Sequence, residues 1–331
     1  MYNYLKQVMK RFVVAIIFLT IVFRVAAQDY IFSQYYLDKF SINPAFAGIG
    51  AYSEVGTIFR DQWPGIEKGY KIYSAYYRQK LPSVQSGLAL RVNGNVSGGA
   101  YSQNAASVIY AYDFHLTYGV KCSLGIEIGF LNKSLNQSQL VYYSMIDAAT
   151  GNTSALNESV EYDSYNSLHF STGVCVYTKH TIVGLGVHRL TKMVITGVDN
   201  YMPVLLTGFV NHKIVLNTVT IKQKVEDIYI LPSLLYTHSP VADMIMPGVS
   251  FSGYKLRLGL AYRYQRSDYQ SSAIVTSIGF SFGNLELGFG HDFDLGAISG
   301  ISKGSNEVGL KYNFENSQKN KGSKTILCPA F

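Results

Sequence analysis

Charged residues are scarce in this chain. Only 15% of its 331 residues are charged, whereas 14% are aromatic, with 27 Tyr. An ordinary globular domain carries roughly 25% charged residues. The shortage of charge, together with the excess of Tyr, predicts a surface that mostly does not face water.

Long hydrophobic runs are also missing beyond residue 27. A membrane-spanning helix needs about 20 consecutive apolar residues. The mean hydropathy of +0.09 is likewise too low for a bundle of such helices. The sequence therefore excludes a helical membrane protein.

The patterns that mark catalytic and metal sites are absent. The seven His are scattered, with no HExxH pairing and no His–Cys cluster, and there is no Walker A loop or Rossmann fingerprint. A Ser and a His could still meet across strands, as in outer-membrane hydrolases, which sequence does not reveal. We expect no enzymatic activity, no cofactor and no metal.

Cysteine is rare, with Cys122, Cys175 and Cys328 alone. Cys122 shares the parity of Leu124 and faces away from the side to which Cys175 points, so a disulfide between them is not expected. Cys328 is left as a tolerated thiol or a contact point.

The first 27 residues carry an export signal. Lys6, Lys10 and Arg11 precede the apolar run 12–23, and Val25-Ala26-Ala27 supplies a small-residue cleavage site. This pattern is typical of a Sec signal peptide, with an uncleaved anchor helix as the alternative. Cleavage removes four of the 28 basic residues and none of the 21 acidic ones, which leaves a net charge of +3. A nucleic-acid partner is therefore not expected.

Alternation dominates the rest of the chain. Large apolar residues occupy one parity and small, Gly-rich or charged residues the other in five segments: 88–93, 124–130, 256–264, 274–282 and 285–293. A soluble sandwich has the same period, but its outer face needs charge. An outer-membrane barrel places large apolar residues toward lipid and small or polar ones inside. The sequence favours an all-β, antiparallel transmembrane barrel with about 14 strands over 51–314.

The connections between the expected strands alternate between short and long, as in outer-membrane barrels with periplasmic termini. Residues 132–162 form the longest, a solvated external loop or a contact surface for a secreted partner. The eighth connection, at 218–226, is too long for the pattern. Residues 305–314 are expected to close the barrel by pairing with the first strand, which leaves 315–331 as a periplasmic tail.

The segment 28–50 is too small and Pro-broken for a lipid-facing strand, because it contains Asn43-Pro44-Ala45. We expect it in the lumen or across the periplasmic mouth. Trp63-Pro64-Gly65 is expected to form the first external turn, with Trp63 near the membrane interface.

Charged residues of mixed sign share the inward parity, and they either satisfy one another or line a polar path: Arg91, Glu127, Arg257, Arg263, Glu286, Asp292, Glu307 and Lys311. A barrel of about fourteen strands can be plugged or open. On this parity argument, Asp at Leu310 would place charge on the lipid face, whereas Asp at Lys311 would leave folding nearly intact.

Several short motifs recur together near the two ends of the chain: Phe32–Tyr35, Asn43–Gly48, Arg60–Gly65, Gly288–Asp292, Ser305–Glu307 and Cys328–Phe331. In this combination the chain resembles the PorP/SprF family of type IX secretion membrane proteins. Ser305-Asn306-Glu307 departs mildly from the Ser-His-Glu typical of the family. The motif residues carry no assigned role in the family: Asn43, Pro44, Ala45, Gly48, Trp63, Pro64, Gly65, Glu307, Cys328, Pro329 and Phe331.

The resemblance implies an outer-membrane barrel of the type IX secretion and gliding apparatus. Its partners would be a secreted protein with a type B C-terminal domain, such as an adhesin, or periplasmic ring components. The expected function is export or surface attachment of that protein. A general or solute-specific porin is the alternative, since it shares the fold and the compartment.

Overall fold

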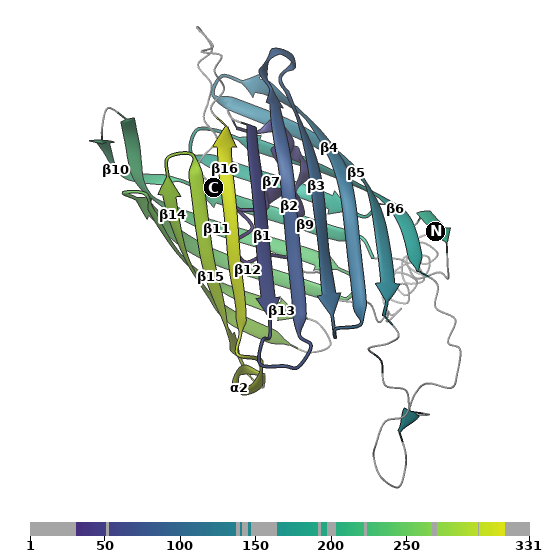
Figure 1. The fold of residues 1–331 in the computed structure, drawn as a ribbon. Helices are drawn as coiled ribbons and strands as arrows, with labels where there is room; N and C mark the ends of the chain where they lie inside the picture. The colour runs from purple at the N-terminus through teal and green to yellow at the C-terminus, as the bar shows by residue number, and fades with distance from the viewer. Residues whose placement is uncertain are drawn as a thin grey trace, which may run out of the picture.

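The computed structural model describes residues 31–50, 53–136, 140, 145–146, 164–190, 193–196, 203–221, 224–266, 270–296 and 298–314. They form a barrel of antiparallel strands around a short N-terminal segment (Figure 1). The strands are β1 (Ser53–Gln62), β2 (Tyr70–Leu81), β3 (Ser86–Ser97), β4 (Tyr101–Thr117), β5 (Val120–Leu135), β6 (Tyr165–Tyr177), β7 (Thr181–His188), β8 (Met193–Thr196), β9 (Leu205–His212), β10 (Ile214–Ile221), β11 (Lys224–Ser239), β12 (Ala242–Gly253), β13 (Leu256–Arg266), β14 (Ser271–Phe282), β15 (Leu285–Leu295) and β16 (Ser305–Phe314). The short helices are η1 (Lys39–Ser41), η2 (Pro44–Gly48), η3 (Pro82–Val84) and α2 (Ser299–Ser302).

The barrel closes through two pairings. β16 pairs with β1 along its whole length, from Ser305↔Gln62 to Phe314↔Ser53, as the sequence predicted. β9 pairs with β11, which completes a ring of 14 strands. β8 lies off the ring and pairs with β6, and β10 continues β9 along β11. The predicted fold class and strand number are confirmed.

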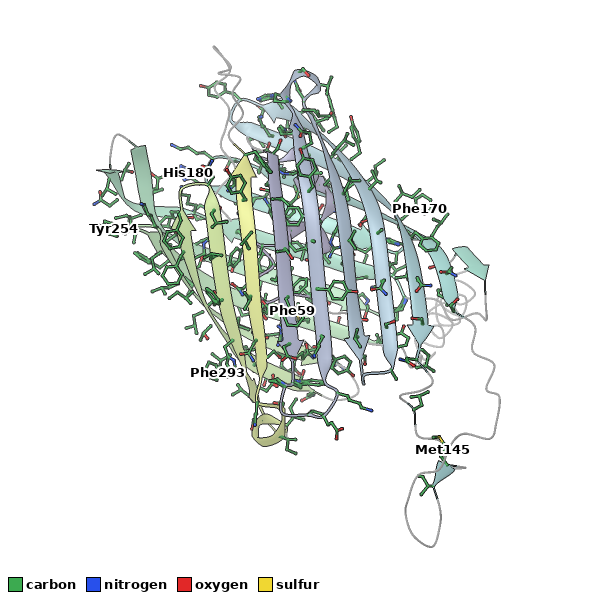
Figure 2. The ribbon with its side chains drawn as sticks, viewed as in Figure 1. Phe59, Met145, Phe170, His180, Tyr254 and Phe293 are labelled. Carbon is green, nitrogen blue, oxygen red and sulfur yellow. The ribbon has the colours of Figure 1, made fainter. Side chains whose placement is uncertain are left out.

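The two faces of the wall divide as the alternation predicted. On β16, Val308, Leu310, Tyr312 and Phe314 are exposed on the outside, whereas Glu307 and Lys311 are buried within. Figure 2 shows aromatic side chains such as Phe59 and Phe293 along the outer surface. This exposed apolar face is the surface that lipid covers in an outer-membrane barrel. Among the described residues, no helix combines the length and apolar character that crossing a membrane requires.

The two rims of the barrel differ. We call the rim with the β1–β2 connection and α2 the α2 rim, and the opposite rim, where β16 ends, the β10 rim (Figure 1). Connections at the β10 rim are short, such as 118–119, 254–255 and 283–284. The long connection expected at 132–162 does join β5 and β6 on the α2 rim, although β5 runs on to Leu135.

One predicted boundary is wrong. The eighth connection was expected at 218–226, but β10 continues to Ile221 and β11 begins at Lys224. The strands do not end where their neighbours end, and the resulting hairpin extends beyond the rim. Residues 1–27, the tail 315–331 and most of 137–163 lie outside the described residues.

The outer face of β16 supplies a direct test of the lipid-facing assignment. We expect Leu310→Asp to impair membrane insertion, because a charge on the lipid face is destabilising. Near the midplane an acidic residue costs somewhat less than the roughly 2–4 kcal/mol of Arg or Lys. Insertion into outer-membrane vesicles, measured by heat-modifiable gel mobility, checks this. Ser250→Asp is the control, since Ser250 lines the lumen cavity. Equal loss of insertion in both variants would contradict the assignment.

Lys311 is not the tolerant position that parity suggested. Its side chain is buried, and Nζ lies 2.9 Å from Glu286 Oε2. An aspartate there would place two carboxylates together inside the wall, so the structure predicts a loss of stability where parity predicted nearly intact folding.

A plugged lumen as the candidate functional site

Residues 31–50, which we call the plug, lie inside the barrel. Nearly every side chain of this segment is buried, and η2 contacts β3, β4, β5 and β6. Asn43 caps η2 by accepting a hydrogen bond from Ala45 N–H at 2.9 Å, and Pro44 takes the first helical position, where no N–H is needed. The sequence Asn-Pro-Ala thus forms a compact turn that fits within a barrel.

One carboxylate holds the start of the plug near the α2 rim. Glu307 on β16 accepts the backbone N–H of Ser33 at 2.7 Å on Oε1 and that of Gln34 at 2.8 Å on Oε2. Hydrogen bonds from backbone N–H groups to a carboxylate are among the strong ones in proteins. Two neighbouring amides on one carboxylate fix both the position and the direction of the chain.

Two arginines complete this contact, which we call the Glu307 lock. Arg60 Nη1 lies 2.6 Å from Glu307 Oε1 and 2.7 Å from Asp292 Oδ2. Arg263 Nη2 lies 2.7 Å from the same Asp292 oxygen, and Ser33 Oγ donates to it at 2.9 Å. Buried charges of this kind require partners on all sides, and here the plug supplies some of them.

A row of glycines forms the seat of η2. A Cβ at Gly87 would lie 1.8 Å from Ala47 O, and one at Gly125 would lie 2.3 Å from Ala45 N. Because these contacts are with backbone atoms, only glycine permits the plug to approach the wall so closely. Gly173 and Gly186 make room for the residues just before η2. An added Cβ would lie 2.1 Å from the Asn43 side-chain Oδ1 at Gly173 and 2.7 Å from Ile42 O at Gly186.

Polar groups of the wall bind the plug backbone beside this seat. The Asn43 amide donates to Leu185 O at 2.9 Å and Val174 O at 3.1 Å. Thr207 Oγ1 donates to Ile42 O at 2.5 Å. The middle of the plug is therefore bound to β6, β7 and β9, on the side of the barrel opposite the Glu307 lock.

Basic side chains hold the plug toward the β10 rim. Lys39 Nζ lies 3.1 Å from Glu54 Oε1, and Arg91 Nη2 lies 2.8 Å from Asp38 Oδ2. Arg78 donates to Ile49 O, and Lys80 donates to Gly48 O. Each section of the plug is thus bound by charged or polar groups of the wall.

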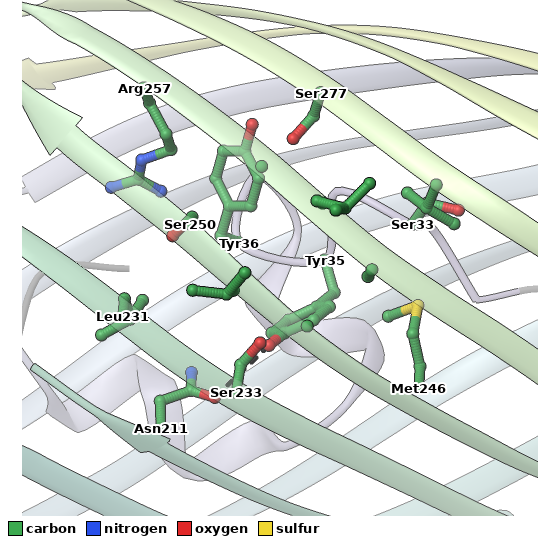
Figure 3. A pocket seen from close by; sticks show the side chains of 16 residues that line it. Ser33, Tyr35, Tyr36, Asn211, Leu231, Ser233, Met246, Ser250, Arg257 and Ser277 are labelled. Atoms are coloured by element: carbon green, nitrogen blue, oxygen red, sulfur yellow. Dashed lines mark hydrogen bonds between the residues drawn. The ribbon is translucent and has the colours of Figure 1, made fainter.

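The plug leaves a small cavity against β11–β14. Its volume is about 60 Å³, and Figure 3 shows Tyr35, Tyr36 and Arg257 among the side chains around it. The Arg257 guanidinium lies 4.7 Å from the centre of the Tyr36 ring, within the range of a cation–π contact. Burial raises the pKa of Tyr36 to about 12, so this phenol stays neutral.

The structure brings together some of the motif residues named from the sequence and separates others. Asn43, Pro44, Ala45 and Gly48 belong to the plug, and Glu307 belongs to the lock. Trp63-Pro64-Gly65 forms the β1–β2 connection, with a turn hydrogen bond from Ile66 N–H to Trp63 O at 2.9 Å. Cys328, Pro329 and Phe331 lie outside the described residues.

Sequence reasoning missed the partners of the plug. Arg60, Glu54 and Arg78 were not among the predicted lumen charges, although Glu54 and Arg60 share the inward parity of β1 with Gly56. That parity was the available signal. Of the two alternatives for the lumen charges, the structure shows mutual pairing for Arg263 with Asp292 and for Lys311 with Glu286.

Cys122 and Cys175 are both buried and form no disulfide with each other, as predicted. In the described part of the chain, no three His, Cys, Asp or Glu side chains gather closely enough to hold a metal ion.

Comparison with solved structures finds chains of similar fold. The TodX deltaS2S3 mutant monoaromatic hydrocarbon channel is 11% identical with a TM-score of 0.50, over 86% of this chain and 94% of that one. The CymD monoaromatic hydrocarbon channel is 9% identical with a TM-score of 0.49, over 89% and 96% of the two chains. At these identities the likeness shows the fold alone.

A comparison with curated proteins finds no match. A model of one protein family matches residues 24–312, which is most of the chain, and its description is type IX secretion system membrane protein PorP/SprF. The match extends from the plug through the barrel to β16. The chain therefore belongs to the PorP/SprF family of type IX secretion system membrane proteins, with an outer-membrane barrel as its fold.

Proposed function

We propose that this barrel acts in the export or surface attachment of a secreted protein, such as an adhesin, and that it is not an enzyme. The family membership supports a role in type IX secretion. The plug is the observation that carries the proposal, because residues 31–50 are buried inside the barrel and are bonded to its wall on opposite sides. A lumen filled in this way suits a membrane anchor or docking partner better than a passive pore.

The proposal includes an orientation in the membrane. Residues 1–27 serve as a Sec signal peptide, and the β10 rim and the tail 315–331 face the periplasm, where ring components of the apparatus would be met. The short connections at that rim support this orientation. Trp63, whose ring packs edge-on against Tyr70 at 5.3 Å, then lies at the external end of the barrel.

The second candidate function is a solute porin. The cavity beside Arg257 and Tyr36 favours it, because polar groups meet there in a partly open space. A porin, however, must conduct by itself. In planar bilayers, we expect the purified barrel to give little current, and a steady large conductance independent of any secreted protein would favour the porin.

Deletion of the gene for this chain in its source cells tests the proposed function. We expect at least one secreted protein to disappear from the cell surface or to shift into the medium or the periplasm, as read by mass spectrometry of each fraction. Restoring the intact gene is the control. An unchanged set of surface and secreted proteins in the deletion strain would contradict the proposal.

A further inference from the structure

The hairpin of β10 and β11 leaves one strand edge open at the β10 rim. β7 is the neighbour of β9 on this edge, and its first residue, Thr181, pairs with His212. β7 therefore does not reach β10, which begins at Ile214. β10 pairs with β11 from Ile214↔Ile230 to Ile221↔Lys224. Among the described residues, no strand pairs with the other edge of β10, which stands away from the wall in Figure 1.

β10 lacks the features that usually protect such an edge. Its eight residues, IVLNTVTI, contain no charge and no proline. Native edge strands are normally blunted by lysine, proline, bulges or a covering segment. A bulge between Val215 and Asn217 is present, and Asn217 Oδ1 accepts the backbone N–H of Thr218 at 2.8 Å. Uncharged β-branched segments of this length pair readily with other strands.

Apolar side chains are exposed on both faces of β10. Leu216 and Ile214 share the outward parity and are 55% and 46% exposed. Val215 has the opposite parity, which points toward the lumen side, and is 37% exposed. An isolated two-stranded ribbon is marginally stable in water. A third strand along β10 would bond the open backbone groups and cover these side chains.

We propose that β10 is a docking edge for an extended segment of the protein that the barrel exports or retains, added as a β-strand antiparallel or parallel to β10. The complement of an unpaired strand edge is another strand edge, and main-chain pairing supplies affinity in this mode. The apolar faces of β10 favour an uncharged, β-branched donor strand of about eight residues. The inference rests on the proposed function for the identity of the partner.

A second copy of this chain fits the edge less well. Antiparallel pairing of two β10 edges has its two-fold axis perpendicular to the sheet. Because the sheet is the barrel wall, that axis lies near the membrane plane and would invert one barrel relative to the other. Two barrels inserted in the same orientation therefore cannot pair antiparallel through β10.

Photo-crosslinking in the source cells tests the docking edge. Asn217 on β10 and Tyr118 in the β4–β5 connection are each replaced by p-benzoylphenylalanine in the full chain. Both sites are exposed on the β10 rim, Tyr118 by 99%. After irradiation, we expect an adduct at residue 217 alone, with the crosslinked peptide assigned by mass spectrometry to an extended segment of an exported protein.

A charge on the edge supplies the matched comparison. Val215→Lys should lower the yield of the residue-217 adduct about tenfold, because lysine blunts strand addition. Val84→Lys makes the same change at a residue exposed on the same rim and should leave the yield unchanged. Heat-modifiable mobility confirms that both barrels fold.

Three results would overturn the docking edge: no adduct at residue 217, an adduct with a second copy of the chain, or an adduct insensitive to Val215→Lys. Each is separable from failure of the proposed function. If deletion still removes a secreted protein from the surface, the function stands and docking lies elsewhere on the barrel.

Discussion

Replacing Glu307 by alanine is expected to detach the start of the plug and to open a conducting path through the barrel. This carboxylate accepts the N–H groups of Ser33 and Gln34 and pairs with Arg60 at 2.6 Å. Removing one member of a buried charge pair typically costs 3–5 kcal/mol. We expect about 3 kcal/mol in the free energy of unfolding in urea, because Arg60 keeps Asp292.

The same variant should carry steady current in planar bilayers where the unaltered barrel gives little. Glu67→Ala is the matched control, because it removes the same charge from a residue that is exposed in the β1–β2 connection. A folded Glu307→Ala barrel with unaltered current and stability would show that the lock does not hold the plug.

The barrel could be predicted from sequence because its signal is local. Strand β16 was read from SNEVGLKYNF alone, since a period of two places Leu310 and Lys311 on opposite faces whatever the rest of the chain does. Closure followed from the need to leave no strand edge in the membrane. The inward parity of Glu307 and Asp292 was equally local.

The plug contacts could not be predicted in the same way. Ser33 and Glu307 are 274 residues apart, and their meeting depends on the register of every strand between them. Parity shows that Lys311 points inward but not that its partner is Glu286, so parity alone does not show which contact a substitution would remove. The length of β10 also depends on neighbours, because a strand that outruns the rim carries the same local pattern as one that stops there.

The glycine seat reverses the usual meaning of glycine in a strand. Glycine in a strand interior normally weakens it, because it has no side chain to pack and loses more entropy on folding. Here Gly87, Gly125, Gly173 and Gly186 come from four strands and face one object, the turn around η2. These small inward residues, visible in the sequence, are thus the positions at which the wall makes room for the plug.

Replacing Gly125 by valine is expected to expel the plug although valine suits a strand. The new Cβ would lie 2.3 Å from Ala45 N, and a backbone atom cannot move aside as a flexible side chain can. Overpacking of this kind costs about 1–3 kcal/mol. We expect a rise in bilayer current and new protease cleavage within residues 31–50, with the barrel still heat-modifiable.

Gly208→Val is the matched control, because the nearest atom to its added Cβ is Leu185 Cδ2 at 3.4 Å, an ordinary contact. The double variant Gly125→Val with Glu307→Ala then separates two accounts of the current. If both changes act by displacing the same plug, the current cannot exceed that of a barrel without the plug. The double variant then carries no more current than the stronger single variant. Additive currents would mean that the seat and the lock hold independent parts of the chain, each closing its own path through the barrel.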